Sequence, residues 1–190
     1  MNLAESMTDE EFVAIYAFEM TWSNGIGHIN TFNTPGFENR TKPEYKATEA
    51  LQNYYNKLKE FSQSISQLNH PGDTFGDFND FSHYDEEIDA IVNMIEVGNG
   101  EGPVRGSGYF PSYEYYTRAL DKGWHVAPTN NQDNHKGRWG NANTTKSVIL
   151  AESLTEESIY DAMRNLRVYA TEDENLIIKI EDIENFEHKV

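Results

Sequence analysis

The chain has 190 residues, of which 32 are Asp or Glu and 15 are Lys or Arg, so its formal net charge is −17. That charge repels phosphate backbones at long range, which excludes a protein that coats nucleic acid through a general basic surface. The absence of cysteine excludes disulfides and thiolate chemistry, so any metal must be held by nitrogen and oxygen ligands. An aromatic fraction of 13% indicates that the chain folds.

No apolar run approaches the roughly 20 residues that a membrane span needs, so we expect no membrane partner. The first residues also lack the basic and apolar regions of a signal peptide. The sequence therefore fits an extracellular protein as well as a cytoplasmic one. Residues 1–180 are predicted to form one domain, and residues 181–190 an acidic tail.

Apolar, β-favouring runs alternate with helical patterns along the chain. In chain order, the strands are predicted at 12–18, 27–32, 64–69, 91–97, 124–129, 147–151 and 176–180. Helices are predicted at 43–61, 112–122 and 155–167, with a single helical turn near 85–87. Ser112 and Thr155 are the expected N-caps of the last two helices. This alternation indicates an α/β fold with a parallel sheet or a partial (βα) barrel.

Residues that can bind metal gather at the predicted strand ends or in the loops beside them. In parallel α/β folds the C-terminal strand ends form the face where chemistry collects. Carboxylates and imidazoles from several strands suit Zn, Mn or Fe. The residues in question are Glu19, His28, His70, Glu96, Asp133 and His135.

Each of these residues also has an ordinary structural explanation. A single histidine beside a proline is usually a hydrogen-bonded structural residue, and an Asp-x-His pair alone is a weak signal. The coincidence of several such residues at strand ends is what favours a metal site. The sequence holds no G-x-S-x-G elbow, no phosphate-binding glycine loop and no H-E-x-x-H helix, which removes the common rival sites.

Six segments, taken together, resemble the later motifs of the PHP (polymerase and histidinol phosphatase) superfamily. They are AFEMTW at 17–22, GHIN at 27–30, NHPG at 69–72, IEVGNG at 95–100, DNH at 133–135 and RVYAT at 167–171. The resemblance implies a distorted (βα)7 barrel with two or three divalent metal ions (Zn, Mn or Fe). It also implies hydrolysis of a small phosphorylated substrate by a metal-bridging hydroxide.

The resemblance assigns roles to single residues. Glu19 is expected to bridge two ions, and His28 and His70 to bind one of them. Asp133 and His135 are expected to bind the other ions, which makes them, with Glu19, the expected catalytic residues. Glu96 is expected to contact these ligand residues without binding a metal ion itself.

Three cations are expected to hold the oxygens of the phosphate. Lys136 and Arg138 follow the Asp133 and His135 pair directly, and Arg40 is a weaker candidate. The competing interpretation is that these side chains are simply solvated, because Lys and Arg in polar loops are mostly exposed.

The PHP pattern opens with a His-x-His strand and a Thr-Asp-His strand, and neither occurs in this sequence. We therefore expect a partial barrel that is truncated at its N-terminus by two or more strands. Self-association or another chain would complete such a barrel and cover its open sheet edge. A further hypothesis is a non-catalytic, metal-stabilised or carbohydrate-binding module, which the Asn-, Tyr- and Trp-rich loops at 99–116 and 129–143 suggest.

Overall fold

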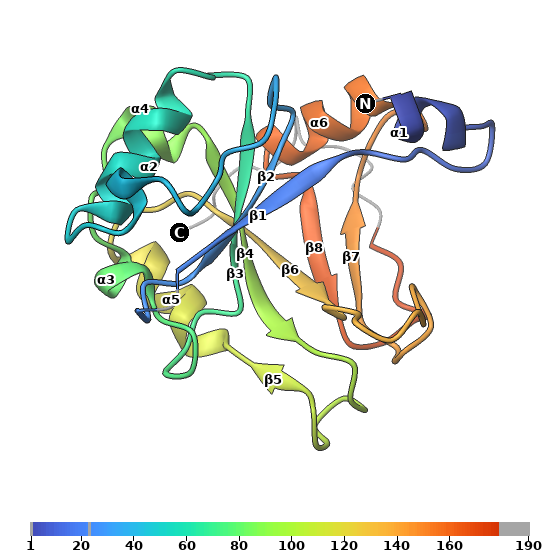
Figure 1. Ribbon diagram of the computed structural model, residues 1–190. Helices are drawn as coiled ribbons and strands as arrows, with labels where there is room; N and C mark the ends of the chain where they lie inside the picture. The colour runs from blue at the N-terminus through green and yellow to red at the C-terminus, as the bar shows by residue number, and fades with distance from the viewer. Residues whose placement is uncertain (1, 23, 179–190) are drawn as a thin grey trace, which may run out of the picture.

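The structure, a computed structural model, describes residues 2–22 and 24–178 and is a mixed α/β fold around a central sheet (Figure 1). The strands are β1 (Ala17–Thr21), β2 (His28–Phe32), β3 (Ile65–Asn69), β4 (Val92–Asn99), β5 (Phe110–Pro111), β6 (Ala127–Asn131), β7 (Lys146–Ile149) and β8 (Val168–Thr171). The helices are α1 (Asn2–Met7), η1 (Pro43–Tyr45), α2 (Ala50–Lys59), α3 (Phe78–Phe81), α4 (Glu86–Asp89), α5 (Tyr113–Asp121) and α6 (Glu156–Arg164). None of the helices described is long and apolar enough to span a membrane.

The central sheet mixes antiparallel and parallel pairing. β1 pairs with β2 and β2 with β3 in antiparallel fashion, whereas β4 is parallel to both β3 and β6. β5 is a short antiparallel partner of β4, and β7 and β8 form a separate antiparallel pair. The predicted α/β class is confirmed. Within the described residues the strands form an open path, and no closed barrel is present.

The first strand lies further along the chain than its apolar pattern predicts. The run at 12–18 was the predicted strand, but pairing with β2 places Ala17 opposite Phe32 and Thr21 opposite His28. Glu19 therefore lies in the middle of β1 and not at its end. The predicted parallel pairing is found for β3, β4 and β6, but not for β1 and β2, because the short turn between those two strands permits only antiparallel pairing.

Other predicted elements differ at their boundaries. The predicted helix at 43–61 is divided into η1 and α2. Ser112 occupies the N-cap position of α5, but its hydroxyl donates to the carbonyl of Glu96 at 2.7 Å and makes no capping bond. Thr155 does cap α6, accepting from the backbone N–H of Ser158. The predicted strand at 176–180 is absent over 176–178, and its last two residues and the tail at 181–190 lie outside the described residues.

The two faces of β1, β2 and β3 have different chemistry. On one face, buried side chains such as Met20, Ile29 and Leu68 join a core cluster that includes residues of α2, α4 and α5. Burial of each such side chain contributes about 1.5–3 kcal/mol. The other face carries polar side chains toward the C-terminal end of β3, because residues two apart in a strand share a face. At the opposite end of that face, α6 packs over a second apolar cluster around Ile65 and Met94.

Candidate metal centre

Three side chains from three neighbouring strands converge on the polar face. Glu19 comes from β1, His28 is the first residue of β2, and His70 directly follows β3. One ligand atom from each of the three lies within 4.8 Å of the other two. Nδ1 of His28 lies 3.5 Å from Oε1 of Glu19, and Nε2 of His70 lies 3.9 Å from the same oxygen. We call these three residues the triad.

The donor set of the triad fits a divalent cation. One carboxylate with two imidazoles is a ligand combination that suits Zn, Fe or Mn. Ligand atoms at about 2.1 Å from a tetrahedral ion stand about 3.4 Å from one another. The measured separations from Glu19 are close to that value, so small side-chain movements bring all three ligand atoms within binding range.

Strand register explains why the triad shares a face. His28 lies directly opposite Thr21 on β1 and opposite Asn69 on β3. Directly opposed residues in antiparallel strands point to the same side, and Thr21 is two residues from Glu19. His70 follows β3 with a positive φ of 29°, which turns the chain before Pro71.

Two glycines allow the loop after His70 to pack against the turn before His28. A Cβ on Gly27, which has a φ of 141°, would overlap the ring of Phe78. A Cβ on Gly76, which has a φ of 116°, would overlap the carbonyl oxygen of Gly25. Only glycine accepts such positive φ values and such close approaches. These contacts hold the two histidine-bearing segments together.

The shifted pKa values of Glu19 and His70 favour the forms of these two side chains that bind a cation. Burial acts to raise the pKa of Glu19, but hydrogen bonds from His28 and Asn69 outweigh it and hold that pKa below its ordinary value. The amide of Asn69 donates to Oε1 of Glu19 at 2.9 Å. Burial and the neighbouring His28 lower the pKa of His70, against the opposing charges of Asp133 and Glu19. His70 is therefore neutral near pH 7, with a lone pair available to a metal.

The environment of the His70 ring supports a role as a ligand. The side chain is 6% exposed, and its ring packs against Phe75 with the centroids 4.5 Å apart. Its Nδ1 is buried and has no hydrogen-bond partner in the described part of the chain. The nitrogen placed toward Glu19 is the other one, Nε2, so a metal ion in the triad would bind Nε2 and leave Nδ1 as it is.

Glu96, predicted to support the ligands, lies behind His70 and is 2% exposed. Its Oε2 accepts from the backbone N–H of His70 at 2.6 Å and from the amide of Asn99 at 3.0 Å. Its Oε1 accepts from the amide of Asn131 at 2.8 Å. Burial raises the pKa of Glu96 to about 8, although these hydrogen bonds act in the opposite direction. Glu96 thus joins β4, β6 and the end of β3 at the point where His70 leaves the sheet.

Asp133 and His135 lie in the loop after β6 and are not part of the triad cluster. Asp133 lines a cavity together with Phe75, the residue that packs on His70, and its charge acts to raise the pKa of both His70 and Glu96. His135 has a side chain that is 79% exposed, and its Nδ1 donates to the carbonyl of Asp133 at 2.7 Å. That bond requires a proton on Nδ1, so Nε2 of His135 is free to accept.

The three cations expected to bind phosphate lie in two places. Lys136 is 3.4 Å from Glu101, and with Arg138 and Asp133 it lines a cavity of about 620 Å³. Arg40 donates to Thr21, two residues beyond Glu19, and lines a separate cavity of about 440 Å³. Sequence reasoning identified these cations but not Asn69, Asn99 and Asn131. The signal for those three was the occurrence of amide side chains within or at the ends of predicted buried strands.

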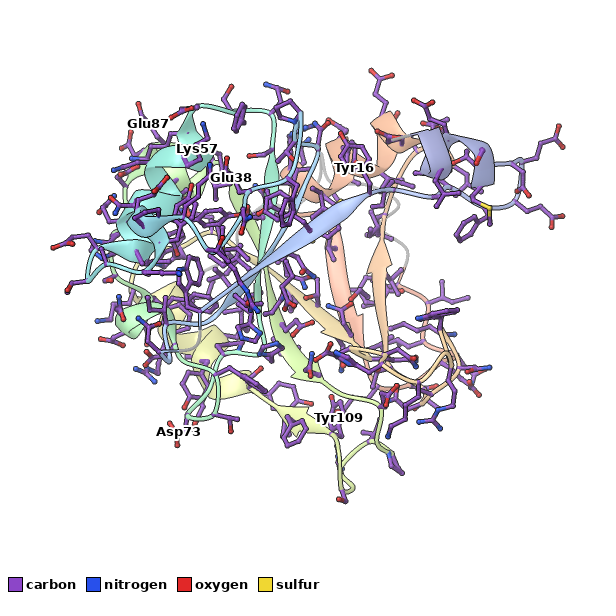
Figure 2. The ribbon with its side chains drawn as sticks, viewed as in Figure 1. Tyr16, Glu38, Lys57, Asp73, Glu87 and Tyr109 are labelled. Carbon is purple, nitrogen blue, oxygen red and sulfur yellow. The ribbon has the colours of Figure 1, made fainter. Side chains whose placement is uncertain are left out.

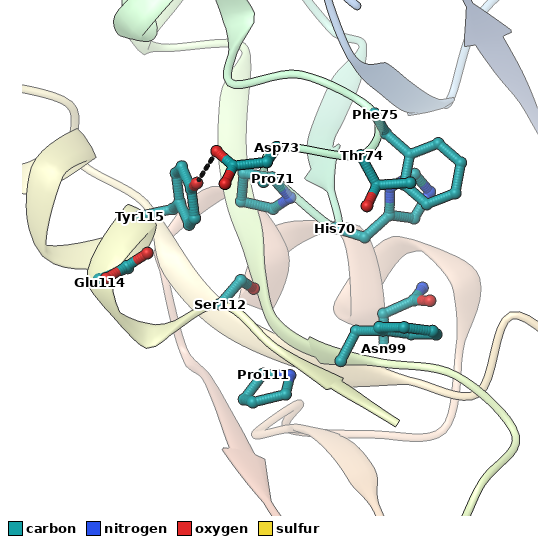
Figure 3. Close-up of a pocket in the computed structure, with 12 residues that line it drawn as sticks. His70, Pro71, Asp73, Thr74, Phe75, Asn99, Pro111, Ser112, Glu114 and Tyr115 are labelled. Atoms are coloured by element: carbon teal, nitrogen blue, oxygen red, sulfur yellow. Dashed lines mark hydrogen bonds between the residues drawn. The ribbon is translucent and has the colours of Figure 1, made fainter. Parts of the chain in front are cut away.

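A further cavity of about 310 Å³ begins at His70 (Figure 3). Figure 3 shows Asp73 and Tyr115 on one side of it and His70, Phe75 and Asn99 on the other. The larger cavity beside Asp133 shares Phe75, Asn99 and Phe110 with it, so the two are neighbours. Figure 2 places Asp73 at the end of the molecule away from Glu38 and Lys57, the end where β3 and β4 finish.

No family model and no curated protein matches the sequence. The structure is similar to the crystal structure of a two-domain protein from Bacteroides vulgatus that contains a predicted PHP-like metal-dependent phosphoesterase, with a TM-score of 0.56 and 19% sequence identity. The two proteins share a fold. The match covers 83% of this chain and 44% of the other, so this chain corresponds to less than half of that protein.

Proposed function

We propose that the chain is a metal-dependent phosphoester hydrolase of the PHP type, whose first divalent cation is bound by Glu19, His28 and His70. The observation that carries the proposal is the convergence of these three ligands from three strands, in a fold shared with a PHP-like protein. Zn, Mn and Fe all suit the donor set. The proposal includes the finer fold assignment, in which the sheet is a part of a distorted (βα)7 barrel.

The other predicted site residues have roles in the same proposal. Asp133 and His135 bind one or two additional ions, and Lys136 and Arg138 hold the oxygens of a small phosphorylated substrate. Arg40 contacts the substrate from the side of β1. The His-x-His and Thr-Asp-His strands of the PHP pattern have no counterpart in these 190 residues, so the proposal assigns only the ligands that this sequence carries.

A bound divalent cation supplies charge stabilisation at the phosphoryl oxygens and lowers the pKa of a bound water to near neutrality. The protein residues do the remaining work. Glu19 is negatively charged and His70 is neutral, and their ligand atoms point toward one another. Glu96 fixes the position of His70 by accepting a hydrogen bond from its backbone N–H. Phe75 packs on the rings of both histidines and shields them from water on that side.

The proposal is tested with the full chain, stripped with chelator and reloaded with Mn²⁺ or Zn²⁺. Hydrolysis of p-nitrophenyl phosphate and of bis(p-nitrophenyl) phosphate is expected only in the reloaded protein. His70→Ala should abolish it, whereas His125→Ala should not, because His125 is an exposed histidine that pairs with Asp89 outside the triad. A chain that binds metal at the triad and hydrolyses neither ester contradicts the proposal and favours a non-catalytic module.

A further inference from the structure

The cavity that begins at His70 has a composition unlike that of its neighbour. We call it the ring subsite and define it by Pro71, Asp73, Phe110, Glu114 and Tyr115. Apolar and aromatic surfaces form much of its wall, and its lining contains two carboxylates and no Lys or Arg. The adjoining cavity beside Asp133 contains both Lys136 and Arg138.

The carboxylates of the ring subsite are placed to accept hydrogen bonds. Asp73 accepts from the hydroxyl of Tyr115 at 2.9 Å through Oδ1 (Figure 3). Glu114 lies exposed in the first turn of α5. The guanidinium of Arg118 stacks on the ring of Tyr115 at 5.1 Å and is engaged by Asp77 at 3.1 Å and Asp80 at 2.6 Å. An anion in the subsite would therefore meet negative charge that no lining cation offsets.

The aromatic groups of the subsite suit a flat ligand. Phe110 is 59% exposed on β5, the short strand that borders the cavity, and Pro111 follows it. Tyr115 also lines the cavity; it is mostly buried and lies beside Gly72. A volume of about 310 Å³ is at the lower end of the range for small-molecule sites and is sufficient for one ring system.

We propose that the ring subsite binds the leaving group of the substrate, and that this group is a neutral or cationic flat ring with hydrogen-bond donors. This inference rests on the proposed function for the reaction itself. In that reaction the oxygen of water forms a bond to phosphorus, the ester P–O bond breaks, and the ring-bearing alcohol leaves with a water proton. The phosphoryl group faces the triad and Lys136, while the ring lies against the exposed side chain of Phe110 in the ring subsite.

The binding test uses the full chain in the presence of chelator, in about 0.15 M salt, so that surface charges are screened. Benzylamine, benzyl alcohol, benzoate and n-butylamine are titrated, with binding followed by NMR. n-Butylamine is the matched probe for charge alone, because a net charge of −17 attracts every cation. Benzylamine should bind about three- to tenfold more tightly than n-butylamine, as expected for one aromatic contact, and benzoate should bind most weakly.

Variants assign the binding to this cavity. Phe110→Ala should lower the affinity for benzylamine at least about threefold, whereas Phe12→Ala, which removes a similarly exposed ring elsewhere, should leave it unchanged. Glu114→Gln should reduce the preference for benzylamine over benzyl alcohol. Equal binding of benzylamine and n-butylamine, or no effect of Phe110→Ala, overturns the inference.

A second arm separates this inference from the proposed function. In the metal-loaded chain, benzyl phosphate should be hydrolysed with a higher kcat/KM than n-butyl phosphate, and Phe110→Ala should remove that preference. Loss of hydrolysis with probe binding intact overturns the proposed function alone. Hydrolysis of both esters at equal rates in a chain that does not bind benzylamine overturns the ring subsite alone.

Discussion

Glu19, His28 and His70 belong to, or directly follow, strands that pair with one another, whereas Asp133 and His135 belong to a loop beyond the end of β6. The His70 side chain is 6% exposed and the His135 side chain is 79% exposed. Residues of both regions were predicted to be metal ligands of one site. The difference teaches that strand pairing fixes the positions of Glu19, His28 and His70 relative to one another, whereas a loop alone sets the positions of Asp133 and His135.

Removal of a triad ligand is expected to have the largest effect. His70→Ala should lower the affinity for the first equivalent of Mn²⁺ or Zn²⁺ by more than about 100-fold, because changes of residues that only support a ligand already cost 10- to 100-fold. Titration calorimetry of chelator-stripped protein measures this. His125→Ala serves as the control, and an unchanged first equivalent in His70→Ala would refute the assignment of the triad.

Glu96 should have the next largest effect, because it acts on the triad through the backbone of His70. Glu96→Gln keeps the volume of the side chain but replaces one accepting oxygen with a donating amide. We expect about tenfold weaker metal binding, within the range for residues that orient ligands. The melting temperature is measured alongside, since a fall in affinity that merely follows unfolding would show a general structural role instead.

The packing between the turn that joins β1 and β2 and the loop after His70 can be tested at two glycines of that turn. Gly25→Ala places a side chain at a φ of 78°, near the left-handed helical region, at a cost of about 1–2 kcal/mol, whereas Gly27→Ala places one at a φ of 141°, which essentially only glycine adopts. Only Gly27→Ala also overlaps Phe78, whereas the position of Gly25 is open. Urea unfolding should therefore show Gly27→Ala to be about 1–3 kcal/mol less stable than Gly25→Ala. Equal stabilities would show that the Phe78 contact does not fix the turn.

The loop ligands should have the smallest effect on the first ion. The double variant Asp133→Ala with His135→Ala is expected to keep the first equivalent within about tenfold of its original affinity and to lose any later equivalents. Calorimetric stoichiometry distinguishes the two outcomes. If the double variant loses the first equivalent as well, the loop and the strands form one site and the contrast between them fails.

Much of this arrangement could be predicted from local sequence. The alternating run that ends in Asn69, His70, Pro71 and Gly72 is a strand followed by a turn, and it brought His70 to the correct end of the sheet. The helical pattern predicted over 43–61 is confirmed in α2, where Leu51, Tyr54 and Leu58 recur at helical spacing and are buried. Local propensity and periodicity were sufficient for these features because they require no knowledge of distant partners.

Other features depend on partners that the sequence does not reveal. The boundary of β1 follows from its register with β2, and an apolar pattern alone cannot show which residues will pair. The register between β4 and β6 shifts between Glu96 and Gly98, and a local pattern does not show such a shift. The close approach of Gly27 to Phe78 joins residues about fifty positions apart, and no local signal predicts it.

The most direct test of the central claim is an anomalous-scattering map from crystals of the full chain grown with Zn²⁺. The account predicts a peak at about 2.0–2.2 Å from Oε1 of Glu19 and from one ring nitrogen each of His28 and His70. In crystals of His70→Ala this peak should disappear. A Zn²⁺ peak that lies only elsewhere, with the three side chains unchanged and no density between them, would contradict the account.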